Sequence, residues 1–259
     1  MIFAWIQNDC FRNFEIIVGI LHDLGIATRK QLHIISKFTL PTLDKAIREL
    51  SRRELIQIDT LPDHRSIYRL SRLGSQYAQG LTGNYNLKLA PEFQVSHFLG
   101  LNDILVRLIE NFGLNYYWDT TKEATDYLYY LRLMHAGLNE SDVQKTFIKP
   151  DAYLEFCENS FWVEYDNSTE SSTQLLKKYR LYITNLNSRM VGYQNVIWIT
   201  KDKKRKEFLK LLWKDLDVNV IKMYFFVAGE EIQFLRRILD KKSANNENHN
   251  ELSKMIELS

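Results

Sequence analysis

Three carboxylates in the segment KPDAYLEFCENSFWVEYD, residues 149–166, have types and spacing suited to metal binding. Glu164 and Asp166 are two residues apart in a strongly apolar run, so in a β-strand they project from the same face. The polar stretch CENS before that run predicts a hairpin, which would place Asp151, at the start of the preceding strand, opposite them. The sequence therefore predicts that the three carboxylates lie close together in a sheet.

Grouped carboxylates repel one another unless protons or a hard divalent cation lie between them, and Mg²⁺ or Mn²⁺ takes such oxygen ligands. A metal ion held by Asp151, Glu164 and Asp166 would activate water and stabilise charge on a phosphoryl group. The alternative is that these side chains are solvated charges at strand ends, which is the usual state of Asp and Glu. The apolar residues around Glu164 favour the metal site, because a charge in such a strand needs an opening in the sheet.

The first third of the chain has the pattern of a winged helix-turn-helix. Apolar residues recur at helical spacing over residues 10–24, and Thr28 and Gln31 have the spacing of a capping box at the start of a second helix. Pro41 suits the first turn of a third helix. Two short β-rich runs, LIQID and SIYRL, are joined by the polar turn TLPDHR and predict a two-stranded wing. A last helix completes the motif near residue 80.

Charge in this region suggests a partner. The whole chain carries 34 Lys and Arg against 32 Asp and Glu, so attraction to nucleic acid must come from a local patch. Residues 28–72 hold ten basic and five acidic side chains, and this excess lies where a duplex would dock on the third helix and the wing. The candidate DNA-binding residues are Arg29, Lys30, Thr42, Lys45, Arg48, Arg52, Arg65 and Arg69.

The rest of the chain predicts an α/β domain with a mixed sheet. A helix, strands near 116–119 and 128–133 and the hairpin are followed by a helix–strand–helix–strand ending, which implies a crossover and helices covering the sheet. The predicted organisation is a winged helix (1–82), a linker (83–95), the α/β domain (96–228) and a C-terminal helix with a tail (229–259), flexible over 242–250.

Three further features have ordinary explanations beside the functional ones. His97 is expected to be a packed or capping histidine. Asp103 is expected to pair with Arg107 one helical turn later, and is otherwise a weak candidate for the carboxylate site. The basic run KDKKRKEFLKLLWK, from Lys201 to Lys214, is the outer face of an amphipathic helix or a second contact for phosphates.

Several classes of protein are not supported. The chain has two distant cysteines without metal-ligand spacing, and it has no apolar run long enough for a membrane span. It also has no Gly-rich phosphate loop or dinucleotide fingerprint. We therefore expect a cytoplasmic protein without membrane contact.

Pro-Asp, a hairpin, Glu-x-Asp at a strand end and then a helix with Lys and Tyr together resemble the restriction-endonuclease-like PD-(D/E)xK fold. More narrowly, the order of a winged helix, HFLGLND, KPDAYLEF, FWVEYDNSTES and KKYRLY resembles the replication-relaxation family of plasmids and integrative conjugative elements of Gram-positive bacteria. The resemblance covers roughly residues 10–228.

The resemblance implies roles for individual residues. Asp151 matches the first metal-binding Asp of the nuclease motif and Glu164 matches its acidic partner, while Asp166 stands where the motif carries a Lys. Lys178 in the following helix would then supply the missing cation. Catalytic candidates are thus Asp151, Glu164, Asp166 and Lys178, with Mg²⁺ or Mn²⁺ on the three carboxylates if the site is active.

Two main functions follow. The first is a DNA-binding protein of a mobile element, acting in plasmid replication initiation or DNA relaxation and mobilisation, with a catalytically silent nuclease-like domain. The second is an active metal-dependent endonuclease that nicks DNA, and a winged-helix transcription regulator is a third. Expected partners are double-stranded DNA, a second copy of the chain, and replication or mobilisation proteins that contact the C-terminal tail.

Overall fold

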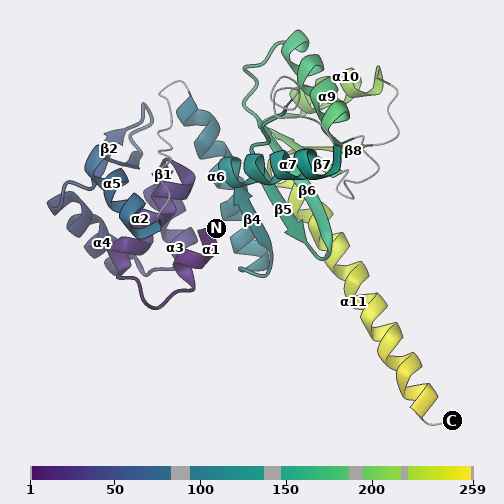
Figure 1. The fold of residues 1–259 in the computed structure, drawn as a ribbon, viewed down its shortest axis with the longest axis horizontal. Helices are drawn as coiled ribbons and strands as arrows, with labels where there is room; N and C mark the ends of the chain where they lie inside the picture. The colour runs from purple at the N-terminus through teal and green to yellow at the C-terminus, as the bar shows by residue number, and fades with distance from the viewer. Residues whose placement is uncertain (1, 83–93, 137–146, 187–194, 217–220, 258–259) are drawn as a thin grey trace.

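The computed structural model describes residues 2–82, 94–136, 147–186, 195–216 and 221–257. Its helices and strands form a mixed α/β structure with a three-stranded and a five-stranded sheet (Figure 1). The predicted α/β class with a mixed sheet is confirmed. No described helix is both long enough and apolar enough to cross a membrane.

The N-terminal unit, residues 2–82, contains the helices and the hairpin that the sequence predicts. Its three strands pair antiparallel in the order β1-β3-β2. Its elements are α1 (Ile2–Ile6), α2 (Asn13–Leu24), β1 (Ala27–Thr28), α3 (Arg29–Ser36), α4 (Leu40–Arg52), β2 (Ile56–Thr60), β3 (Ser66–Leu70) and α5 (Arg72–Thr82).

Local capping explains where these helices begin and end. Gly25 follows α2 with a φ of 76°, a left-handed conformation that glycine adopts without strain. The predicted capping box at the start of α3 is confirmed, because Thr28 and Gln31 each accept a hydrogen bond from the other's backbone N–H. Thr39 caps α4, and Pro41 occupies its first turn.

The C-terminal unit, residues 94–257, is built on the five-stranded sheet, in the order β4-β5-β6-β7-β8. β4, β5 and β6 are antiparallel, whereas β6, β7 and β8 are parallel and connected through helices. The elements are α6 (Val95–Phe112), β4 (Tyr117–Thr120), α7 (Thr121–Ala136), β5 (Ala152–Phe156), β6 (Asn159–Asp166), α9 (Ser172–Leu186), β7 (Asn195–Thr200), α10 (Lys203–Lys214), β8 (Lys222–Val227) and α11 (Glu230–Glu257).

Helices cover both faces of this sheet. Phe161, Val163 and Tyr165 of β6 belong to the core that includes α6 and the start of α11. Trp162, on the opposite face of the strand, packs in a second core with α7, α9 and α10. Glu164 alternates with these residues and therefore projects toward the α7, α9 and α10 side.

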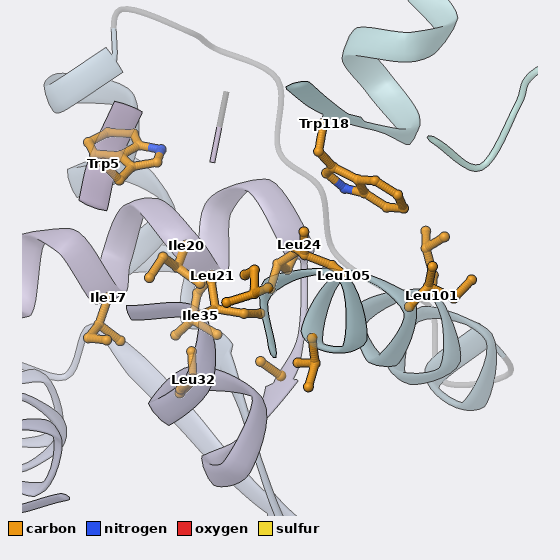
Figure 2. Close-up of a cluster of buried hydrophobic side chains, with 14 of the residues drawn as sticks. Trp5, Ile17, Ile20, Leu21, Leu24, Leu32, Ile35, Leu101, Leu105 and Trp118 are labelled. Atoms are coloured by element: carbon orange, nitrogen blue, oxygen red, sulfur yellow. The ribbon is translucent and has the colours of Figure 1, made fainter. Parts of the chain in front are cut away.

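One hydrophobic core joins the N-terminal unit to the sheet. Trp5 and the apolar residues of α2 and α3 lie beside Leu101 and Leu105 of α6 and Trp118 of β4 (Figure 2). Asn102 of α6 donates a buried hydrogen bond of 2.6 Å to the carbonyl of Ile26. The two units therefore pack directly against each other, whereas most of the predicted linker, residues 83–93, lies outside the described residues.

Two predictions about elements are wrong. Residues 128–133, predicted as a strand, lie inside α7, because Ala124, Leu128 and Leu131 bury one helical face against the sheet. α11 continues to Glu257, so residues 242–250 are helical instead of a flexible break. That stretch contains no Gly or Pro to end the helix, and Figure 1 shows α11 extending away from the rest of the molecule.

Two glycines of α5 give a matched test of packing between this helix and the end of α4. A Cβ on Gly74 would lie 1.8 Å from the backbone oxygen of Leu55, whereas a Cβ on Gly80 would meet nothing within 4 Å. We expect Gly74→Ala to lower the free energy of unfolding by about 1–3 kcal/mol through overpacking. Gly80→Ala should raise it by about 0.5–1 kcal/mol through helix propensity. Urea denaturation measures both, and equal effects would contradict the described packing.

Candidate functional site

Asp151 lies where β5 begins, and four contacts fix it. Its backbone N–H donates to the Val163 carbonyl at 3.1 Å, and Thr121 donates to its carbonyl at 2.8 Å. One carboxylate oxygen, Oδ2, accepts the N–H of Tyr165 at 2.9 Å, and the other, Oδ1, lies 3.0 Å from Nε2 of His97. The hairpin thus places Asp151 beside the residue that follows Glu164, as the sequence predicts.

Glu164 lies in the middle of β6, and its side chain has no solvent exposure. Lys178 of α9 brings its ammonium to 2.6 Å from Oε2 of Glu164. Tyr182, one turn further along α9, donates a short hydrogen bond to Oε1. Both oxygens of this buried carboxylate are therefore engaged by a single helix.

The pKa values of these groups reflect one shared charge. Burial raises the pKa of Glu164 well above its usual range, with Asp151 adding to the effect and Lys178 opposing it. Burial lowers the pKa of Lys178, but Glu164 and Asp151 outweigh burial and the net pKa is raised. Burial also raises the pKa of Asp151, yet the hydrogen bond from His97 and the charge of Lys178 bring it down to about 2. Lys178 therefore stays cationic beside the two carboxylates.

Asp166 does not join this group. Its carboxylate forms a bidentate pair with Arg205 of α10, at 2.5 Å from Nε to Oδ2 and 3.0 Å from Nη2 to Oδ1. The backbone N–H of Ser168 also donates to Oδ1. Among the described residues, no three or more His, Cys, Asp or Glu side chains are arranged to hold a metal ion.

A cleft of about 480 Å³ opens beside this group, and it exposes only some of the members. Asp151, Lys178, His97 and Asp166 line it, whereas Glu164 lies behind Lys178. A divalent ion does not fit the carboxylates as they stand. Lys178 and Tyr182 occupy the oxygens of Glu164, and His97 and a backbone N–H occupy those of Asp151.

Three contacts of the site escaped the reading of the sequence. His97 is packed, as expected, between Phe98 and Tyr165, but it also holds Asp151. Tyr182 and Arg205 bind the two carboxylates of β6. The spacing of Lys178 and Tyr182, four residues apart on one helix face, was the available signal for Tyr182.

Asp103 and the basic run of α10 have other partners than those expected. Asp103 accepts a hydrogen bond from Gln31 of α3 at 2.7 Å, and Arg107 pairs with Glu231 of α11 instead of Asp103. In α10, Arg205 binds Asp166 and Lys206 lies 2.9 Å from Glu230. Part of the basic run is thus used inside the molecule.

The candidate DNA-binding residues differ in how free their charges are. Lys30, Lys45 and Arg48 are exposed and have no acidic partner within 4 Å among the described residues. The other arginines pair with neighbouring acids, and Thr42 contacts Thr39. Those pairs are Arg29 with Asp44, Arg52 with Glu49, Arg65 with Asp63 and Arg69 with Asp59.

Comparison with protein-family models gives one match, to the model described as replication-relaxation, over residues 19–195. The match covers more than half of the chain and includes α2 to α9 with the Asp151 and Glu164 strands. The chain belongs to the replication-relaxation family. Comparisons with curated proteins and with solved structures gave no match. The family match thus spans both the N-terminal unit and the carboxylate site of this replication-relaxation protein.

The contact between His97 and Asp151 predicts a pH-dependent stability of this replication-relaxation protein. Burial lowers the pKa of His97, but the hydrogen bond to Asp151 outweighs it, and the net pKa is raised. A raised pKa means that the stabilisation is fully present below the unfolded value of about 6.5 and is lost as pH rises through the folded value. The melting temperature lost in His97→Gln should therefore be larger near pH 5.5 than near pH 8.5 (the two ends of that window, roughly).

The control is the same substitution in an Asp151→Asn background. The carboxylate partner is then absent, so the effect of His97→Gln should no longer change with pH. A pH dependence that survives in the Asp151→Asn background would mean that another group causes it.

Proposed function

We propose that this replication-relaxation protein binds duplex DNA through its N-terminal unit, as a winged helix-turn-helix, with α4 entering the major groove and the β2–β3 hairpin beside it. On this proposal it acts in plasmid replication initiation or in DNA relaxation and mobilisation, and its nuclease-like unit is catalytically silent. The family match supports the role in replication or relaxation.

One observation carries the DNA-binding part of the proposal. Lys45 and Arg48 lie three residues apart on the exposed side of α4, while Leu43, Ala46 and Ile47 bury the opposite side. Free cations on an exposed helix face bind phosphates or base edges without first breaking an ion pair. The paired arginines of the same region are already neutralised by neighbouring acids. Lys45 and Arg48 are therefore the residues we expect to contribute most.

The test is Lys45→Ala/Arg48→Ala, measured by fluorescence anisotropy with labelled duplex at several salt concentrations. Loss of phosphate contacts should weaken binding to all sequences and reduce the salt slope by about 0.9 per contact. Loss of base contacts should cost about 1–3 kcal/mol each on the specific site only.

The matched control is Lys177→Ala/Arg180→Ala. These residues are also one Lys and one Arg three residues apart, and both are exposed, but they lie on α9 of the C-terminal unit. Removing them changes the net charge equally and should leave duplex affinity nearly unchanged. Equal losses from the two double variants would show only a general charge effect, and no loss from either would sink the proposed role of α4.

The second candidate function, metal-dependent nicking of DNA, is favoured by the placement of Lys178 beside Asp151 and Glu164. In that mechanism a lysine would neutralise charge on a phosphate while carboxylates held Mg²⁺ or Mn²⁺. The engaged carboxylate oxygens and the ion pair of Asp166 favour the silent unit instead.

Supercoiled plasmid separates the two functions. We expect no open-circular product when the chain is incubated with plasmid and Mg²⁺ or Mn²⁺, because the ligands of an ion are already occupied. Nicking that disappears in both Asp151→Asn and Glu164→Gln would establish the endonuclease in place of the silent unit. Nicking that persists in both variants would come from a contaminant.

A further inference from the structure

Lys178 occupies the position from which a cation would serve both carboxylates of the site. Its Nζ lies 2.6 Å from Oε2 of Glu164 and 3.8 Å from Oε1 of Glu170, and it lies 5.2 Å from the centre of the Trp198 ring. Its charge also acts on Asp151. One ammonium group thus balances a cluster that would otherwise bring several negative charges together out of water.

The way into the site passes Lys178. The side chain of Lys178 is 21% exposed and lines the cleft, whereas that of Glu164 is 0% exposed and does not line it. A divalent ion entering from the cleft therefore meets a positive charge before it reaches Glu164. Like charges at contact distance repel strongly in such a partly dry environment, so the ion and the ammonium exclude each other.

We propose that Lys178 is the resident cation of this site, that it keeps divalent ions out of the free protein, and that replacing it with a neutral side chain opens a Mn²⁺ site. The ligands of that site would be Asp151 and Glu164, and His97 would supply a nitrogen from α6. Oxygen and imidazole donors of this kind suit Mn²⁺. The inference rests on the proposed silent state of the same unit and explains it physically.

A purely structural ion pair makes a different prediction. If Lys178 only held α9 on the sheet, its loss would destabilise the protein and create no affinity for metal. If Lys178 stands in for a metal ion, its loss leaves two carboxylates facing an unfilled position, and Mn²⁺ restores the missing charge. Recovery of stability by the ion is therefore the decisive readout.

The experiment measures melting temperature by circular dichroism while MnCl₂ is added to EDTA-treated protein at neutral pH. The melting temperature of Lys178→Ala should rise with Mn²⁺, because binding to the folded state alone stabilises it, and its Mn²⁺ affinity should exceed that of the native chain by at least about tenfold. Native protein should not respond. Lys178→Ala/Glu164→Gln should lose the response.

Lys177→Ala is the matched control, because it removes the adjacent, exposed lysine and should behave as the native chain does. If Lys178→Ala does not fold, Lys178→Gln keeps more of the side-chain packing and is titrated in the same way. A folded Lys178 variant without a Mn²⁺ response would overturn the proposal. So would a response of the native chain that Asp151→Asn abolishes.

Failure here is distinguishable from failure of the proposed DNA binding. The Mn²⁺ titration contains no DNA, and Lys178 lies in the C-terminal unit. Duplex affinity of the Lys45→Ala/Arg48→Ala variant is measured without metal. A Mn²⁺ response in native protein would thus remove the silent state while leaving the N-terminal unit as the DNA-binding part.

Discussion

The burial of one carboxylate, Glu164, determines how the C-terminal unit is arranged. A charged group without solvent exposure costs several kcal/mol unless hydrogen bonds and an opposite charge compensate it. Both compensating groups, Lys178 and Tyr182, come from α9, four residues apart. Because a helix presents such a pair on one face, the contacts fix the rotation of α9 about its axis and its position along β6. Trp198 then packs edge-on against Tyr182 from the neighbouring strand.

Helix α6 passes this order to the N-terminal unit, because opposite sides of the same helix contact the two units. His97, near its start, reaches Asp151, and less than two turns later Asp103 accepts from Gln31. Gln31 also donates to the carbonyl of Leu99 at 2.9 Å while its oxygen caps α3. Gly100 lets α6 approach β6, since a Cβ there would lie 2.1 Å from the Tyr165 ring. The position of α3 relative to the carboxylates is thus set within a short length of one helix.

Local signals in the sequence predicted most elements correctly, and long-range contacts account for what they missed. The capping box of α3 and the β5–β6 hairpin depend on residues a few positions apart, so spacing was sufficient. Residues 128–133 combine aromatic and branched residues that favour a strand, but burial of Leu128 and Leu131 against the sheet makes them helical. At the site, spacing gave the proximity of Asp151 and Glu164. It could not give the Arg205 pair, because that arginine lies 39 residues from Asp166.

The pairing of Asp166 also bears on where DNA is expected to bind. An acid at this position, where the nuclease motif carries a lysine, reverses a charge beside the site and needs a cation of its own. Arg205 supplies it, and Lys206 is held by Glu230 in the same helix. The basic run of α10 therefore offers fewer free charges to phosphates than its composition suggests, although Lys203 and Lys204 remain exposed. Because binding strength follows the number of free cations that reach phosphates, the balance moves toward α4 of the N-terminal unit.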